Sequence, residues 1–137
     1  MSKSYSYEEK IDEFIRAYVN AMLWASCDDD QVPLDKNYSI DDVAPSAMEK
    51  IVAECKRFKE ENADDIAPIL YRRTSDDNWS GEEQAGHDFA LTRNGHGVGF
   101  WDRDYLTEEV SDRLTNASHK FGETYLYVGD DNMIYSE

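Results

Sequence analysis

The most regular hydrophobic pattern in the chain lies near its beginning. Between residues 5 and 27, apolar residues recur every three or four positions, and the acidic residues of the first turns lie off this stripe. The stripe consists of Ile11, Phe14, Ile15, Tyr18, Val19, Met22 and Leu23. Acidic side chains in a first turn interact favourably with the helix dipole. The pattern predicts one amphipathic helix over residues 5–27.

A second stripe follows Pro45, a residue type that suits the first position of a helix. Its apolar members are Met48, Ile51, Val52, Cys55 and Phe58, and the other face alternates acidic and basic residues. This pattern predicts a helix over 45–61, with Ser39 or Asp41 capping a short turn before it. A shorter helix is expected within residues 62–71.

From about residue 86 the apolar pattern changes to a period of two. The segment GHDFALTRNGHGVGFWDRDY, residues 86–105, alternates large apolar residues with small or polar ones on both sides of an Asn-Gly pair. An Asn-Gly pair between alternating runs is the strongest short-range signal for a β-hairpin. The pattern therefore predicts a hairpin over this segment, preceded by one helical turn that Gly86 ends.

The last part of the chain predicts a helix and another hairpin. Thr107 suits an N-cap, Gly122 suits a helix end, and an apolar stripe lies between them. The runs TYLYV and MIYS then flank the turn sequence GDDN. We expect one domain over residues 1–137, with a helical part over 5–72 and a hairpin–helix–hairpin part over 87–136. The fold class is α+β, with N-terminal helices packed on a small antiparallel sheet made of the two hairpins.

The net charge narrows the classes of partner. The chain has 137 residues and 40% hydrophobic residues, enough for a core, but 30 Asp and Glu stand against 14 Lys and Arg. The formal net charge of -16 repels nucleic acid and anionic membranes and attracts basic protein surfaces. We therefore expect a protein partner with a basic surface, no direct contact with nucleic acid and no contact with a membrane.

Cysteine usage and the start of the chain bear on location. Cys27 and Cys55 are too few for a disulfide scaffold, and both fall in segments expected to be helical, which predicts two reduced, buried thiols. The first residues contain no apolar leader segment, and no apolar run approaches the length that spans a membrane. These features predict a cytoplasmic protein.

One enzymatic interpretation is a metal-dependent hydrolase or nuclease of the ββα type. Its candidate residues are His87 and Asp88 at the start of a strand and His119 in the next helix. Three features disfavour it: the expected turn is tight, neighbouring strand residues point in opposite directions, and the charge opposes an approach to DNA. We expect no catalytic residue, metal or cofactor, and keep the hydrolase as an alternative.

The acidic residues are the stronger candidate for function. Paired carboxylates on a rigid surface imitate the phosphates of a nucleic acid and fit the basic groove of a nucleic-acid-binding protein. The candidate partner-binding residues are Asp28, Asp29, Asp30, Asp35, Asp41 and Asp42, with Trp101 and Tyr105 as aromatic anchors.

A resemblance adds to this hypothesis. The segment AGHDFALTRNGHGVGFWDRDY, followed by GETYLYVGDDNMIY, resembles a family of short proteins encoded by bacteriophages and other mobile elements. Their shared segment is close to GHDFxLTRNGHGxGFWDR, with a later LYVGDDG-like ending, in which Asn132 stands where glycine is common. The resemblance brings no assigned activity or catalytic residue. It implies a phage or plasmid origin and the cytoplasm of a bacterial host.

Three hypotheses of function follow. The first is a non-enzymatic acidic protein that binds a basic protein surface as a nucleic-acid mimic and inhibits a host defence complex, in the manner of anti-restriction or anti-CRISPR proteins. The second is the metal-dependent hydrolase built on His87, Asp88 and His119. The third is an accessory or structural phage domain without inhibitory activity. The sequence leaves the oligomeric state open.

Overall fold

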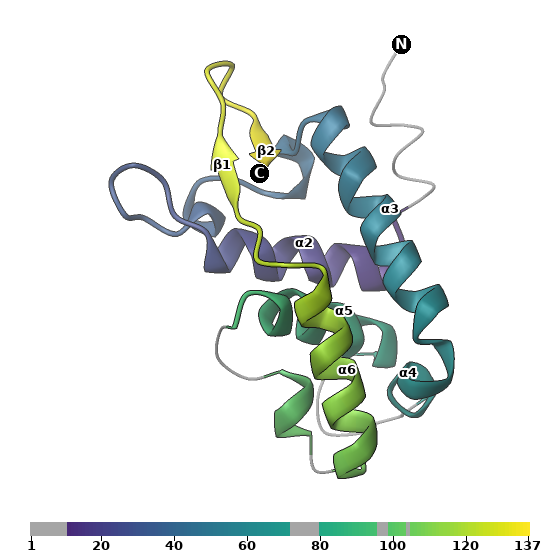
Figure 1. Cartoon of the computed structure of the whole chain (residues 1–137). Coiled ribbons are helices and arrows are strands. Elements are labelled where there is room, and N and C mark those ends of the chain that lie inside the picture. Colours follow the sequence, from purple (N-terminus) through teal and green to yellow (C-terminus); the bar gives the residue numbers. More distant parts are fainter. Residues whose placement is uncertain (1–10, 72–79, 96–98, 104) are drawn as a thin grey trace.

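The computed structural model describes residues 11–71, 80–95, 99–103 and 105–137 of the chain (Figure 1). In this part, five α-helices surround a core, and one sheet of two short antiparallel strands completes an α+β fold. The helices are α2 (Glu13–Ala25), α3 (Pro45–Glu61), α4 (Ala63–Leu70), α5 (Gly81–Arg93) and α6 (Glu108–Lys120). Three 3₁₀ turns, η1 (Leu34–Lys36), η2 (Ile40–Asp42) and η3 (Phe100–Asp102), and the strands β1 (Leu126–Val128) and β2 (Ile134–Ser136) complete the order.

The first two predicted helices are confirmed. The helix α2 begins after Asp12, whose side chain accepts a hydrogen bond from the backbone N–H of Ile15 at 2.9 Å. The predicted residues 5–10 lie outside the described part of the chain. The helix α3 has the predicted bounds, with Pro45 as its first residue, because proline lacks only an N–H that a first helical turn leaves unused.

The predicted central hairpin is wrong. Residues 86–93 form the second half of α5, which begins at Gly81 and passes through Gly86 without interruption. The Asn-Gly pair is the end of this helix: Asn94 is its C-cap, and Gly95 has a φ of +68°, a conformation that glycine adopts without strain. Phe100 to Asp102 form the turn η3 in place of a second strand, and residues 96–98 lie outside the described part.

Burial explains why the sequence of α5 did not reveal a helix. The helix contacts α2, α4, α6 and η3, so it has almost no solvent-facing side. Its buried residues are Gly81, Ala85, Gly86, Asp88, Phe89, Ala90, Leu91, Thr92 and Arg93. A helix buried on most sides has no polar stripe and therefore lacks the helical period that α2 and α3 show.

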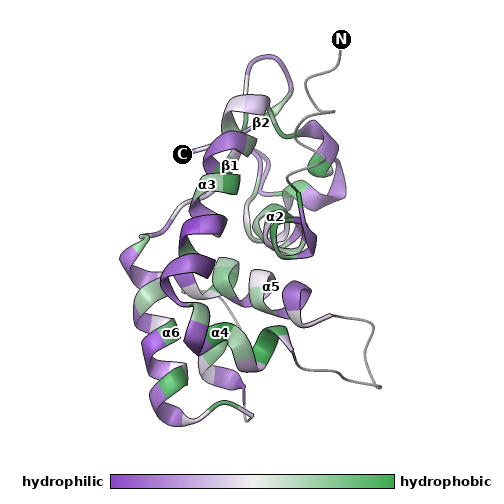
Figure 2. Cartoon of the chain, turned by 90° about the vertical axis from the view of Figure 1, so that its right-hand side faces the viewer, coloured by the Kyte–Doolittle hydropathy of each residue, from purple (hydrophilic) through white to green (hydrophobic). Residues whose placement is uncertain are grey.

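The core is centred on aromatic rings from four elements. Phe58 of α3 stacks on Phe89 of α5 with 4.1 Å between ring centroids. Phe100 of η3 also stacks on Phe58, with 5.9 Å between centroids. Phe14 and Tyr18 of α2 approach Phe89 at 6.3 and 5.3 Å. Figure 2 shows the complementary outer surface: α3 and α6 carry mostly hydrophilic residues.

The predicted C-terminal hairpin is confirmed. Tyr127 of β1 is directly opposite Tyr135 of β2 in the antiparallel register. Leu126 and Ile134 are buried in the core, and the two tyrosines point to the other side of the sheet, as the alternation of a strand requires. In Figure 1 the hairpin lies at one end of the molecule, on the opposite side of α2 from α5 and α6.

The two thiols differ in environment. Cys55 is buried on α3, as predicted, and burial raises its pKa well above the ordinary value. Cys27 is exposed, which corrects the expectation of a buried thiol, because it lies beyond the last residue of α2 and pairs with Pro33 in a loop bridge. None of the helices in the described part combines the length and apolar character that crossing a bilayer requires.

Candidate functional site

Two stretches far apart in the sequence form one end of the molecule, which we call the acidic end: residues 28–44 and 126–136. The backbone N–H of Leu126 donates a hydrogen bond to Ser26 Oγ at 3.0 Å, and that of Ala44 donates to the carbonyl of Ile134 at 2.8 Å. Tyr38 Oη donates to Asn132 Oδ1 at 3.0 Å. These bonds fix the hairpin against the end of α2 and against residues 38–44.

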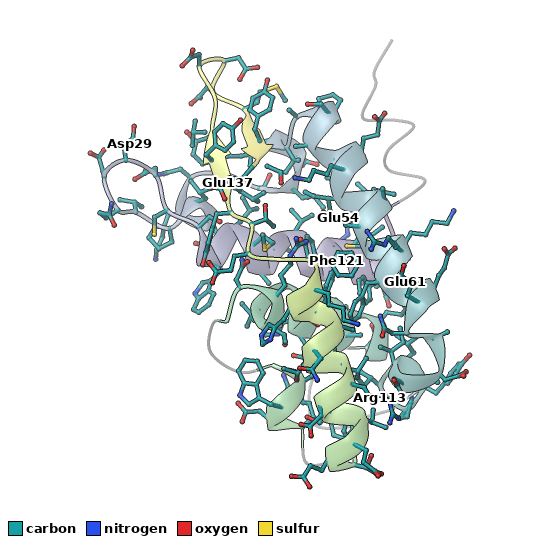
Figure 3. All side chains as sticks on the ribbon, viewed as in Figure 1. Asp29, Glu54, Glu61, Arg113, Phe121 and Glu137 are labelled. Carbon is teal, nitrogen blue, oxygen red and sulfur yellow. The ribbon has the colours of Figure 1, made fainter. Side chains whose placement is uncertain are left out.

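The first loop is held by one of its own acidic residues. Asp28 Oδ1 accepts hydrogen bonds from the backbone N–H groups of Asp30, at 2.8 Å, and Val32, at 3.0 Å. Gln31 takes a φ of 68°, which closes the turn. Asp29 and Asp30 are exposed at its tip, and Figure 3 shows Asp29 projecting away from the rest of the chain.

The turn η2 is held by a capping box. Ser39 Oγ accepts from the backbone N–H of Asp41 at 3.2 Å, and Asp42 Oδ2 accepts from the N–H of Ser39 at 2.9 Å. The Asp42 carboxylate is half-buried and already accepts a hydrogen bond, whereas the side chain of Asp41 is exposed. Of the two predicted caps, Ser39 and Asp41, the structure has Ser39.

Almost all charged side chains of the acidic end are negative. Its two stretches contain eight acidic residues and a single basic one, Lys36. Five of these carboxylates are exposed and make no hydrogen bond or ion pair with any other described residue; they are Asp29, Asp30, Asp35, Asp41 and Asp130. Because their oxygens are unoccupied, these five side chains are available to an external cation.

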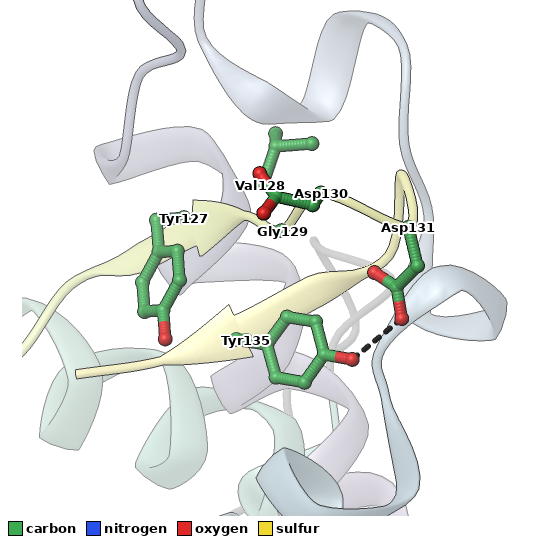
Figure 4. Close-up of a pocket in the computed structure, with 6 residues that line it drawn as sticks. All are labelled: Tyr127, Val128, Gly129, Asp130, Asp131 and Tyr135. Atoms are coloured by element: carbon green, nitrogen blue, oxygen red, sulfur yellow. Dashed lines mark hydrogen bonds between the residues drawn. The ribbon is translucent and has the colours of Figure 1, made fainter.

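Two tyrosines on the hairpin lie beside Asp130 and Asp131. The rings of Tyr127 and Tyr135 stack with 5.9 Å between centroids and 25° between planes, and the Tyr135 hydroxyl donates to Asp131 Oδ2 at 2.6 Å (Figure 4). This bond lowers the pKa of Asp131 and raises that of Tyr135. Together with Val128, Gly129 and Asp130, these residues line a shallow hollow.

The predicted aspartates all lie at the end of the molecule that carries the hairpin (Figure 1), whereas the predicted aromatic anchors do not. The acidic loops contact α2, whereas Trp101 belongs to η3, which contacts α5 and α6. Trp101 is exposed, and Tyr105 is half-buried against the core. The aromatic residues that lie at the acidic end are Tyr38, whose hydroxyl is bonded to Asn132, and the stacked pair Tyr127 and Tyr135. The alternation in TYLYV and MIYS could have predicted the two tyrosines of this pair. Successive residues of a strand face opposite sides, so a residue next to a buried apolar one faces outward.

The three candidate hydrolase residues are not arranged as that hypothesis requires. His87 and Asp88 are consecutive residues of α5, not of a strand, and His119 lies in the last turn of α6. Asp88 is fully buried, and its two oxygens accept bonds from Arg103 Nε at 2.8 Å and Nη2 at 2.7 Å. Within the described residues, no three histidine, cysteine or acidic side chains are grouped to hold a metal ion.

Three further polar residues of segment 86–105 have structural partners: Thr92, Arg93 and Asn94. Arg93 donates to the carbonyl oxygens of Phe121 and Gly122, both at 2.8 Å, and so completes the end of α6. Asn94 bridges to Thr124: its Nδ2 donates to the Thr124 carbonyl and its Oδ1 accepts from the Thr124 N–H, each at 2.9 Å. Thr92 Oγ1 accepts from the N–H of Phe100 at 3.2 Å.

Arg93 also links three helices. Its guanidinium donates to Glu54 of α3 at 2.9 Å and to the hydroxyl of Tyr18 of α2 at 3.0 Å. Burial raises the pKa of Tyr18, although the adjacent Arg93 opposes this effect. These residues of the segment therefore tie α5 to α2, α3, the end of α6 and η3.

Comparison with known proteins does not place this chain in a family. No family model matches it, and no curated protein or solved structure is significantly similar to it.

Proposed function

We propose that the chain is a non-enzymatic binding protein whose acidic end docks onto the basic surface of a nucleic-acid-binding protein. The observation that carries this proposal is the gathering of five exposed, unoccupied carboxylates from two distant stretches of the chain, with Lys36 as the only basic residue among them. Such a surface provides a strong local field of one sign, which steers a basic partner and repels nucleic acid.

The rigidity of the acidic end supports mimicry of a phosphate backbone. The turns that carry the carboxylates are closed by Asp28, the capping box of Ser39 and the Tyr38–Asn132 bond. Charges fixed in advance lose less conformational entropy on binding than charges on mobile segments. A protein that replaces nucleic acid on a basic groove gains the free energy of the same counterion release. The resemblance to phage-encoded proteins makes a host defence complex the partner that we propose.

The proposal is tested by capturing partners with two variants of equal net charge. The first variant changes the five unoccupied aspartates, Asp29, Asp30, Asp35, Asp41 and Asp130, to asparagine. The control changes five exposed acids elsewhere to their amides: Glu60, Asp64, Asp102, Asp112 and Glu123. Tagged wild-type and variant proteins are incubated with a nuclease-treated bacterial lysate, and the bound proteins are identified by mass spectrometry.

We expect the wild type and the control to retain the same nucleic-acid-binding protein at 50 mM salt and to release it at 500 mM, because the Debye length falls about threefold between these ionic strengths. The first variant should retain much less, and added duplex DNA should displace the partner from the wild type. Equal capture by both variants would show that net charge alone attracts the partner and would contradict the proposal. Capture that duplex DNA does not affect would contradict mimicry.

A further inference from the structure

The hairpin carries an exposed aromatic pair that the fold does not require for its core. Tyr127 is 47% exposed, and its ring stacks on that of Tyr135 on the side of the sheet that faces away from Leu126 and Ile134. The Tyr127 hydroxyl makes no hydrogen bond with another described residue. Large exposed aromatic side chains are typical of binding surfaces.

Both rings are held in place before any partner arrives. The Tyr135 ring lies directly against the Cα of Gly129, where a side chain at position 129 would overlap it. Its hydroxyl is fixed by Asp131, and its face is covered in part by Tyr127 (Figure 4). The aromatic pair is thus preorganised, which reduces the entropy lost when a ligand packs on it.

The surroundings of the pair are anionic. Asp130 and Asp131 line the same hollow as the two rings, and the carboxylate of Asp130 is unoccupied within the described part of the chain. The hairpin 126–136 contains no basic residue. A hollow formed by aromatic rings and carboxylates attracts a cation that also has a flat apolar face.

We propose that the hollow of Tyr127, Tyr135 and Asp130 binds an arginine side chain of the basic partner; this inference rests on the proposed function and names the group recognised. A guanidinium is planar, stacks on an aromatic ring and pairs with a carboxylate through two parallel N–H groups. A lysine ammonium is more strongly hydrated and lacks the flat face, so it fits the hollow less well. Arginine recognition here would add specificity to the general attraction of the acidic end.

The test is an NMR titration of the full chain with three peptides, acetyl-GGRGG-amide and its lysine and citrulline counterparts, followed through the ring signals of Tyr127 and Tyr135. We expect the arginine peptide to bind about threefold or more tightly than the lysine peptide, the size of one exposed cation–π contact. The uncharged citrulline peptide should not shift these signals.

Three variants locate the binding. Tyr127→Phe keeps the ring and should bind the arginine peptide as the wild type does, whereas Tyr127→Ala should bind about threefold more weakly. Trp101→Ala removes an exposed aromatic side chain elsewhere and should have no effect. The amide spectrum of each variant reports whether the hairpin is intact. If Tyr127→Ala disturbs the hairpin, the affinity of Asp130→Asn for the arginine peptide, with both rings in place, is measured instead and should also be reduced.

Equal affinity for the arginine and lysine peptides, or unchanged binding by both Tyr127→Ala and Asp130→Asn, overturns the arginine site. The proposed function is judged separately by the pull-down. If Tyr127→Ala still captures the partner while the five-asparagine variant does not, the acidic end stands and the arginine site falls. If the wild type captures no partner but prefers the arginine peptide, the arginine site stands and the proposed function falls.

Discussion

The Cα of Gly86 lies against the carbonyl oxygen of Phe14, so close that a Cβ at position 86 would overlap that oxygen. This contact is where α5 crosses α2, and the atoms that a side chain would meet belong to the backbone of Phe14. The absence of a side chain at this position sets the distance between the two helices. A glycine that looked like the end of a helix in the sequence is therefore the point of closest approach between two of them.

We expect Gly86→Ala to destabilise the fold. Alanine favours a helix by about 1 kcal/mol over glycine, but forcing apart two packed backbones costs about 3 kcal/mol, so the net effect is a loss. Urea unfolding followed by circular dichroism measures this change. Ser46→Gly, at an exposed position of α3, is the control and should cost only the loss of propensity. A Gly86→Ala variant more stable than the wild type would contradict the close backbone contact between Gly86 and Phe14.

The Asp88–Arg103 pair gives a second prediction. Asp88→Ala leaves the Arg103 guanidinium half-buried without its carboxylate, and breaking such a pair costs about 3–5 kcal/mol. Glu61→Gln breaks the exposed Arg57–Glu61 pair and should change the free energy of unfolding by less than about 0.5 kcal/mol. Similar losses in the two variants would mean that the buried pair does not hold η3 to α5.

Arg93 gives a third prediction. Arg93→Met preserves much of the side-chain volume but leaves the carbonyls of Phe121 and Gly122 without their donor, which should cost about 3 kcal/mol. Tyr18→Phe removes one acceptor only, and Arg93 keeps its bond to Glu54, so we expect a loss of about 1 kcal/mol. Amide hydrogen exchange in the last turn of α6 should accelerate in Arg93→Met and not in Tyr18→Phe.

A fourth prediction concerns alkaline pH. Burial raises the pKa values of Cys55 and Tyr18 above their ordinary values of 9.0 and 10.0, so the folded state keeps protons that the unfolded state releases. The contribution of Cys55 is complete below about pH 9 and that of Tyr18 below about pH 10, and above these values each declines by about 1.4 kcal/mol per pH unit. Urea midpoints between pH 8 and 11 measure the decline. Cys55→Ala should lower the slope that begins near pH 9, and an unchanged slope would contradict a buried, protonated thiol.

A fifth prediction concerns the hairpin turn. Asn132 has a φ of 67°, a conformation that asparagine and glycine adopt more readily than other residues. Both Asn132→Gly and Asn132→Ala lose the exposed bond to Tyr38, which should cost less than about 1 kcal/mol, but Asn132→Ala should cost about 1 kcal/mol more because of the positive φ. Thermal unfolding distinguishes the two, and equal losses would attribute the cost to the bond with Tyr38 rather than to the backbone.

The sequence predicted correctly the elements that have one buried and one solvent-exposed face, and it failed for the element that is buried on most sides. α3 has one buried and one solvated face, so its stripe and Pro45 together located it correctly. α5 is surrounded, and its polar residues Asp88 and Arg93 are buried against partners distant in the sequence, so neither periodicity nor polarity indicated a helix. The Asn-Gly pair carried a real signal for positive φ at Gly95, but the same conformation ends a helix and turns a hairpin.

The candidate site was predicted in part for a related reason. The aspartates of residues 28–42 could be recognised from composition, whereas Asp130 was not among the predicted binding residues. Their meeting at one end depends on hydrogen bonds such as that between Tyr38 and Asn132, which no local pattern reveals. The predicted anchor Trp101 was chosen by residue type alone, and tertiary packing places it on η3 against α5 and α6, away from the hairpin that carries Tyr127.

The bond between Ser26 and Leu126 has a consequence for the order in which the molecule forms. It joins residues 100 positions apart, so the loops of the acidic end are synthesised long before the strand that holds them. Contacts of such large sequence separation form slowly, because closing the intervening chain costs entropy before the contact stabilises it. The helical core can pack first, and the surface that we propose for binding is then among the last parts of the protein to mature. A basic partner would therefore meet the fixed arrangement of carboxylates only after the hairpin has docked against Ser26 and Tyr38.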